Sequence, residues 1–213
     1  MKRRSAKTRH LGTRILWALM RRLRWIGVRL EPFITVREGE TIVEVAEPPD
    51  TFRFEFLCAE DVDELIRLEP VTNREELNTW FKEGKLCFGV WDESVLIAKM
   101  WCDLNEFNYP PNYRKLSEDE AYLYAAFSDP EYRGQSLAPL MRAKGYAALR
   151  KMGRSKFYSY TDFFNTAARR FKLKLGARNV ALRLHLGLFG KWSTTVTLRR
   201  YSPATERNQS SFA

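Results

Sequence analysis

Six residues in the middle of the chain, RGQSLA at positions 133–138, have types and spacing that could bind a phosphate. They nearly fit the phosphate-cradling pattern Arg/Gln-x-x-Gly-x-Gly/Ala, except that Ser136 stands where the first glycine should be. A helix is predicted to begin at about this serine, and N–H groups at a helix start bind anions with help from the helix dipole. Small residues also let a pyrophosphate approach the backbone. The stretch therefore predicts a pyrophosphate cradle, to which Arg133 and Arg142 could add positive charge.

The elements that must position this loop follow from hydrophobic periodicity. Strands are predicted over 52–57, 86–92, 95–104, 118–127 and 155–160, followed by a terminal hairpin over about 178–187 and 192–200. Helices are predicted over 59–68, 73–83, 136–152 and 165–175, and a loop over 105–117. Strands first cluster and then alternate with helices. This order predicts an α/β fold, a mixed sheet with helices on its faces.

Two spaced motifs in this order resemble the GNAT superfamily of acyl-CoA-dependent N-acyltransferases. The first is SDPEYRGQSLA over 128–138, between a strand and a long helix, and the second is NTAARRFKLKLGA over 165–177. Asn165, Ala168, Leu175 and Gly176 match the N-x-x-A…L-G pattern of that superfamily. The resemblance covers about residues 52–200. It implies the GNAT fold, a mostly antiparallel mixed sheet that splays between its fourth and fifth strands.

The resemblance also implies an N-acyltransferase that takes acetyl-CoA or a longer acyl-CoA as donor. The acyl group would pass directly to an amine in a ternary complex, and the backbone near Phe127 and Ser128 would hold the pantetheine arm. Asn165 and Lys172 belong to the expected cofactor-binding set. The pyrophosphate would lie on Arg133, Gly134, Gln135, Ser136, Leu137 and Ala138. No metal is expected, because the three cysteines show no paired spacing and only two histidines accompany them.

Two positions depart from the pattern of the superfamily. Ser136 replaces a glycine, and the cradle is expected to survive if the φ angle there is negative. Lys172 stands where many members have a tyrosine that protonates the leaving thiolate. This lysine could bind phosphate, donate a proton or face solvent. The general-acid role of the tyrosine in the superfamily therefore cannot be assigned to this position.

Several residues are candidates for the proton transfers. Glu120 starts the fourth strand and Asp103 ends the third, and either carboxylate, or water, could remove the proton of the amine. Tyr158 and Tyr160 lie on one face of the fifth strand and could protonate the thiolate. Each also has a structural alternative, because strand-end carboxylates are commonly exposed and strand tyrosines commonly belong to the core. The remaining candidates are Asp162 and His185.

Positive charge gathers at the N-terminus. The chain of 213 residues has a net charge of +10, and ten of its 36 basic residues lie in residues 1–30. The other 26 balance the 26 acids, so the body is neutral and nucleic-acid binding is disfavoured. Apolar residues from Leu11 to Leu30 recur at three- and four-residue steps, which predicts a basic amphipathic helix. Such a helix could lie on an anionic membrane, pack on the body or a partner, or act as a mitochondrial presequence.

The predicted domains are the basic helical arm over 1–33, a linker with a short strand over 34–51, the acyltransferase domain over 52–201 and a disordered tail over 202–213. The longest uncharged run in the arm is six residues, far too short to span a bilayer. The expected location is the cytoplasm, with the inner face of the membrane as the place where the arm could bind. The amine acceptor could be a lipid or a lipid-linked molecule. The alternative function is a GNAT-fold protein that binds coenzyme A or docks a partner without catalysis.

Overall fold

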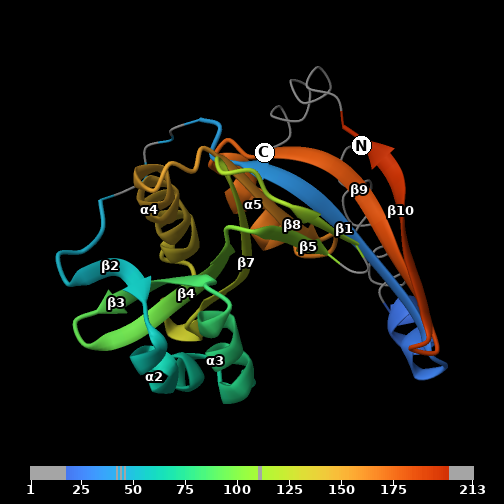
Figure 1. Ribbon diagram of the computed structural model, residues 1–213, viewed down its shortest axis with the longest axis horizontal. Helices are drawn as coiled ribbons and strands as arrows, with labels where there is room; N and C mark the ends of the chain where they lie inside the picture. The colour runs from blue at the N-terminus through green and yellow to red at the C-terminus, as the bar shows by residue number, and fades with distance from the viewer. Residues whose placement is uncertain (1–17, 42, 44, 46, 110–111, 202–213) are drawn as a thin grey trace, which may run out of the picture.

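A computed structural model of the protein describes residues 18–41, 43, 45, 47–109 and 112–201. One sheet of eight strands runs through it in the order β10-β9-β1-β8-β7-β4-β3-β2, and β5 and β6 form a separate hairpin (Figure 1). Neighbouring strands of the large sheet are antiparallel except for the parallel pair β7–β8. This confirms the predicted mixed sheet. The strands are β1 (Val28–Glu38), β2 (Phe52–Leu57), β3 (Leu86–Asp92), β4 (Val95–Asp103), β5 (Glu106–Tyr109), β6 (Asn112–Lys115), β7 (Glu120–Ser128), β8 (Lys156–Asp162), β9 (Arg178–Leu188) and β10 (Trp192–Arg200).

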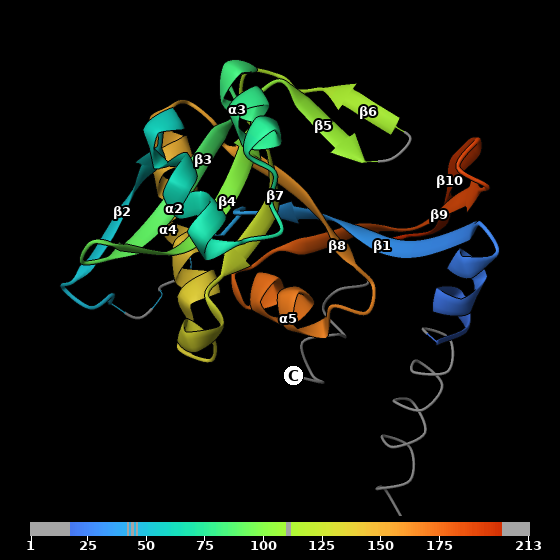
Figure 2. The same ribbon diagram turned by 90° about the horizontal axis from the view of Figure 1, so that it is seen from below.

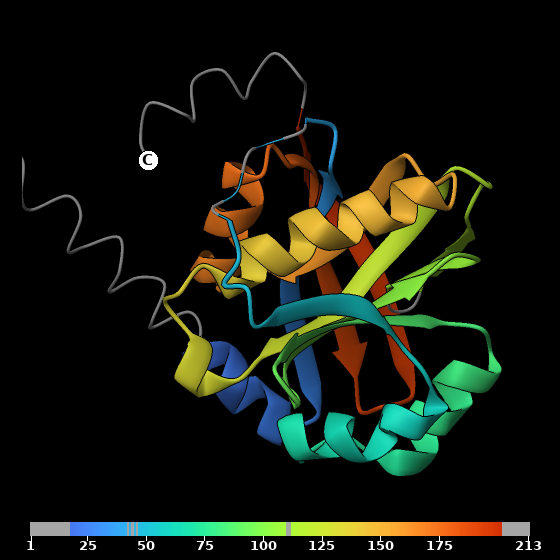
Figure 3. The same cartoon turned by 90° about the vertical axis from the view of Figure 1, so that its left-hand side faces the viewer.

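Helices cover both faces of this sheet. Helices α2 (Val62–Leu68) and α3 (Arg74–Lys82) lie on one side of β2, β3 and β4, and α4 (Leu137–Lys151) lies on the other (Figure 3). Helix α5 (Thr166–Lys174) lies on the same face as α4, and the β5–β6 hairpin on the face of α2 and α3 (Figure 2). Each face has its own core, with Trp101 buried under α2 and α3 and Phe157 under α4. None of the described helices is long and apolar enough to cross a membrane.

The N-terminal segment differs from its prediction. Residues 18–25 are helical, but the chain then turns, and Val28–Glu38 forms β1 rather than the end of a helix and a linker. β1 is an interior strand, paired with β8 on one edge and β9 on the other. Its apolar residues alternate through Leu30, Ile34 and Val36, which fits a strand. Leu30 also fits the helical spacing, so the local pattern cannot distinguish a helix from a strand at this position. Residues 1–17, the tail over 202–213 and part of the predicted strand near 41–45 lie outside the described residues.

Residues 105–117 form a hairpin instead of the predicted loop. Strand β5 pairs with β6 from Glu106↔Lys115 to Tyr109↔Asn112. The buried ring of Phe107 lies 4.8 Å from the ring centroid of Tyr122 and 6.0 Å from that of Tyr158, which anchors the hairpin on the sheet. The described part of this stretch is therefore a pair of strands, and Phe107 joins the core while Tyr113 is exposed.

Candidate active site

The RGQSLA stretch connects β7 to α4. Asp129 starts a short 3-10 turn (Pro130–Tyr132) by accepting a hydrogen bond from the Glu131 N–H at 2.9 Å. Helix α4 then begins at Leu137, and its first N–H groups have no acceptor within the helix. The guanidinium of Arg133 is exposed and lies 6.0 Å from the ring centroid of Phe127, at the end of β7. An anion at this helix start would thus meet backbone N–H groups and a guanidinium together.

Ser136 adopts a left-handed backbone conformation, with φ 59° and ψ 20°. The condition of a negative φ is therefore not met. Gly134, two residues earlier, has φ 83° without strain, but a residue with a Cβ pays about 1–2 kcal/mol in this region. The Ser136 side chain is exposed and makes no capping hydrogen bond. Residue 136 thus has the left-handed conformation that glycine adopts freely, and the hydroxyl of Ser136 does not cap α4.

β7 and β8 separate after three paired residues. Their parallel pairing runs from Glu120↔Lys156 to Tyr122↔Tyr158 and ends there. Farther along, β7 stays on β4 with the pair Lys99↔Phe127, after an irregularity near Ala125, which has φ 44°. The edge of β7 that faces β8 over residues 123–128 has no strand partner in the part of the chain that the structure describes. Phe127 and Ser128 lie at the open end of this splay, directly before the loop of residues 129–136, so an extended ligand could bond the free edge there.

Asn165 and Lys172 lie at opposite ends of α5 and make different contacts. The side chain of Asn165 caps the helix by accepting a hydrogen bond from the Ala168 N–H at 3.0 Å. Lys172 is only 4% exposed, so the option that it faces solvent is wrong. Its ammonium donates to the hydroxyls of Ser159 and Thr161, both at 2.7 Å. Ser159 is the first residue of β8 after the last pair with β7, which places the ammonium where the splay begins.

A fully buried carboxylate, Glu38 at the end of β1, lies at the centre of this polar cluster. It accepts hydrogen bonds from the hydroxyls of Ser159 and Tyr146, and it lies 3.2 Å from the ammonium of Lys172 and 3.6 Å from Nε of Arg142. Burial raises the pKa of Glu38, but Arg142, Lys172 and the two hydrogen bonds outweigh it and lower the pKa to about 2. Burial lowers the pKa of Lys172 to about 8, against the attraction of Glu38. The cluster therefore holds one anion and two cations beneath α4 and α5.

Both carboxylates proposed as bases are held by neighbours. Glu120 is buried at the paired end of β7, where it accepts hydrogen bonds from Nη1 of Arg114 at 2.6 Å and from the Ser117 N–H at 3.0 Å. Burial raises the pKa of Glu120, but these bonds bring it below its ordinary value. Asp103, also buried, accepts hydrogen bonds from the N–H groups of Asn105 and Glu106 at 2.8 and 2.9 Å, which start the β5–β6 hairpin. Each carboxylate thus has a structural role.

Tyr158 and Tyr160 belong to an aromatic wall on the face of α2 and α3. Tyr158 stacks on Phe107, and Tyr160 stacks on Tyr122 with ring centroids 6.3 Å apart. Burial raises the pKa of both phenols above the ordinary value of 10. They remain protonated at neutral pH. Tyr158 lies at the last β7–β8 pair, while Tyr160 lies within the splay and is 39% exposed.

The sequence alone does not indicate that Glu38 belongs to the site. The local pattern assigns residues 34–51 to a linker, and a linker glutamate is expected in solvent. The available signal is the run VRLEPFITVRE over 28–38, in which apolar residues alternate and a carboxylate closes a buried strand. A buried charge at the end of an interior strand requires a partner, but the identity of that partner depends on the tertiary fold.

Comparisons with known proteins agree with this geometry. The family model described as the acetyltransferase (GNAT) family matches residues 52–177. A protein of Novosphingobium aromaticivorans described as a GNAT-family acetyltransferase is 21% identical, with a TM-score of 0.54, over 76% of this chain and 66% of that one. A GNAT-family acetyltransferase of Colwellia psychrerythraea is 16% identical, with a TM-score of 0.54, over 76% of this chain and 57% of that one.

The chain spans less than two thirds of the length of either of these solved structures. At such identities the likeness concerns the fold alone. No curated protein matches the chain.

Proposed function

Because the chain belongs to the acetyltransferase (GNAT) family, we propose that it transfers an acyl group from a coenzyme A thioester to an amine. The observation that carries this proposal is the position of residues 133–138 next to the open end of the β7–β8 splay. The loop offers N–H groups to a pyrophosphate, and the free edge of β7 near Phe127 and Ser128 offers backbone groups to a pantetheine arm. One extended thioester, acetyl-CoA or a longer acyl-CoA, could contact both.

We assign protonation of the leaving thiolate to Lys172. Proton transfer is most efficient when the pKa of the donor lies close to that of the acceptor. A thiol has a pKa of about 8.5, and the pKa of Lys172 is about 8, whereas burial raises the pKa values of Tyr158 and Tyr160. The hydroxyl of Ser159 accepts a hydrogen bond from the ammonium at 2.7 Å and donates to Glu38, which holds the ammonium at the start of the splay.

We assign removal of the amine proton to water. Glu120 is bound by Arg114 and lies at the closed end of the β7–β8 pair. Asp103 holds the first turn of the β5–β6 hairpin. The pKa of Glu120 is lowered rather than raised, and the carboxylate of Asp103 is held by two backbone N–H groups, so neither suits a general base.

We further propose that the protein works at an anionic membrane surface. Four large apolar side chains are strongly exposed at the far end of β1 and β9: Trp25 (89%), Ile26 (63%), Phe189 (69%) and Trp192 (52%) (Figure 1). They lie together because the Phe189 N–H donates to the carbonyl of Gly27 at 2.6 Å. The adjoining helix over 18–25 is rich in arginine. Exposed aromatic residues beside cations favour the interface of an anionic bilayer.

Calorimetry with acetyl-CoA and with a long-chain acyl-CoA, followed by mass spectrometry of amine products, tests the central proposal. We expect saturable binding of at least one thioester and its loss in Ser136→Trp, because a bulky side chain would occupy the start of α4. Glu131→Gln, in the preceding turn, is the matched control and should bind normally. Binding without any transfer would favour the non-catalytic alternative. The absence of both binding and transfer would exclude the proposed function.

A further inference from the structure

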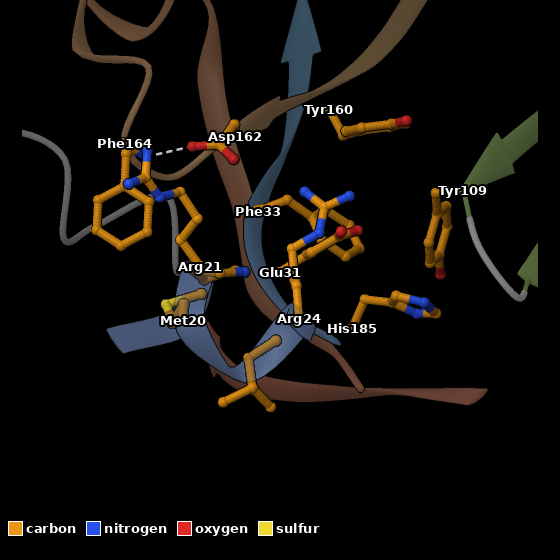
Figure 4. Close-up of a pocket in the computed structure, with 12 residues that line it drawn as sticks. Met20, Arg21, Arg24, Glu31, Phe33, Tyr109, Tyr160, Asp162, Phe164 and His185 are labelled. Atoms are coloured by element: carbon orange, nitrogen blue, oxygen red, sulfur yellow. Dashed lines mark hydrogen bonds between the residues drawn. The ribbon is translucent and has the colours of Figure 1, made fainter. Parts of the chain in front are cut away.

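A cavity of about 280 Å³ lies beside the far end of β8 (Figure 4). β8 ends at the pair Phe33↔Asp162, while β1 continues alone along β9 as far as Val28↔Leu188. The helix over 18–25 folds back along this open edge and contributes Met20, Arg21 and Arg24 to the wall. The N-terminal part of the cavity therefore comes from residues outside the range 52–177 that the family model matches.

The cavity lies next to the splay, where the thioester would bind. Tyr160 lines the cavity and belongs to β8, whose other edge borders the splay. The hydroxyl-bearing ring of Tyr160 also stacks on Tyr122 of β7. Strand β8 thus borders both the cavity and the splay, and Tyr160 connects the two.

One side of the cavity is suited to an ammonium group. Glu31 and Asp162 lie diagonally across β1 and β8 on the same face of the sheet, because Phe33 is opposite Asp162 and two residues after Glu31. The rings of Phe33, Tyr109 and Tyr160 line the same space, with centroids 5.4 Å apart for Phe33 and Tyr160 and 5.6 Å apart for Phe33 and Tyr109. Carboxylates and aromatic faces both attract a cation.

Two arginines of the helix over 18–25, Arg21 and Arg24, also line the cavity and bring positive charge beside these carboxylates. Arg24 lines the cavity, and within the described ranges of the chain no ion pair joins it to Glu31 or Asp162. Figure 4 shows its guanidinium directed into the space between Phe33 and Tyr160. A planar guanidinium binds a carboxylate or a phosphate through two hydrogen bonds. The cavity thus presents anions and a cation to the same ligand.

We propose that this cavity is the acceptor site and that the acceptor is a small primary amine bearing an anionic group. This inference rests on the proposed function. The ammonium would lie among Glu31, Asp162 and the aromatic rings, and the anionic group would meet Arg24. After losing a proton the amine nitrogen attacks the carbonyl carbon of the thioester, and the C–N bond forms as the C–S bond breaks. Of the two protons that the ammonium loses, one ends on the thiolate and the other in solvent.

Paired amines test the proposal: hexylamine with 6-aminohexanoate, ethanolamine with O-phosphoethanolamine, and phenethylamine with phenylalanine. Acylated product is measured by mass spectrometry at saturating acetyl-CoA. We expect the anionic member of at least one pair to have a kcat/KM at least about tenfold higher, since bonds to a charged partner are worth about 1.5–3 kcal/mol. Arg24→Gln should remove most of that preference. Arg22→Gln, on the same helix but not lining the cavity, should retain it.

The two hypotheses fail in distinguishable ways. If calorimetry shows no acyl-CoA binding, the proposed function fails. If acetyl-CoA binds but no amine is acylated, the proposed transfer fails. If amines are acylated without a preference for the anionic members, or if Arg24→Gln leaves that preference unchanged, the cavity is not the acceptor site. Calorimetry on Arg24→Gln should give the wild-type affinity for acetyl-CoA, because Arg24 lies outside the splay and the loop of residues 133–138. A large loss of that affinity would also contradict the assignment.

Discussion

Replacing Glu38 by glutamine should destabilise the protein more than replacing Lys172 by methionine. Two cations, Arg142 and Lys172, surround this one buried carboxylate. Glu38→Gln leaves both cations buried without a counter-charge. Lys172→Met leaves the pair of Glu38 and Arg142 intact and removes the repulsion between the cations. The order of the two effects follows from this charge count.

The pKa of Glu38 sets the size of the expected loss of stability in Glu38→Gln. Its lowering from 4.5 to about 2 corresponds to about 3 kcal/mol in favour of the charged form. Breaking a buried ion pair by removing one partner costs about 3–5 kcal/mol. We expect Glu38→Gln to lower the free energy of unfolding by about 3–4 kcal/mol at pH 7. Lys172→Met loses the hydrogen bonds to Ser159 and Thr161, and we expect it to lower the free energy of unfolding by about 1–2 kcal/mol.

The pH dependence separates the two groups further. Because the folded-state pKa of Glu38 is depressed, its contribution is complete above pH 4.5 and is lost as the pH falls toward 2. The pKa of Lys172 is about 8 in the folded state against 10.5 ordinarily, so the unfolded state binds more protons between these values. Lys172 should therefore contribute more stability as the pH rises across that window, so the free energy of unfolding of the wild type should rise relative to that of Lys172→Met.

Urea unfolding followed by tryptophan fluorescence measures these differences at pH 7 and from pH 8 to 10.5. Glu55→Gln is a matched control, because the exposed Glu55 pairs with Arg53 at 3.1 Å on the surface and should lose less than about 1 kcal/mol. If Lys172→Met is as destabilising as Glu38→Gln at pH 7, or if the wild type loses stability relative to Lys172→Met between pH 8 and 10.5, the balance of charges in this cluster is not as described.

Three further predictions test other parts of the structure. Ser136→Gly should stabilise the protein by up to about 1 kcal/mol in thermal unfolding, because it relieves a φ of 59°; a loss of stability would contradict the left-handed assignment. Trp25→Ser combined with Phe189→Ser should reduce co-sedimentation with phosphatidylcholine–phosphatidylserine vesicles severalfold. Val71→Ser, which replaces a side chain 90% exposed between α2 and α3, should leave it unchanged, and an equal loss in both would exclude the proposed surface. Bonds with Glu60 and Asp61 raise the pKa of the exposed Cys58 thiol to about 11, so its alkylation rate should keep rising to about that pH, and a plateau near pH 9 would refute this.

The sequence by itself determined most elements after residue 52 and the position of the phosphate loop. Alternation predicted β2, and short apolar runs predicted β3, β4 and β7 within a few residues, because these strands bury one or both faces in the two cores that flank the sheet. Asn73, the first residue of the helix predicted over 73–83, caps α3 by accepting a hydrogen bond from the Glu75 N–H at 2.8 Å. These signals are local, since a cap, a turn or an alternating run is complete within about ten residues.

Only the tertiary structure decided the place of β1 and what that strand brings to the site. Leu30 fits a helical stripe and a strand equally well, and pairing with β8 and β9 resolves the choice in favour of the strand. That pairing places Glu38 against Ser159, 121 residues away in the chain, and brings Glu31 close to Asp162 beside the cavity. Contacts between residues so far apart leave no local pattern, because each is set by the register of neighbouring strands and by the helices packed over them.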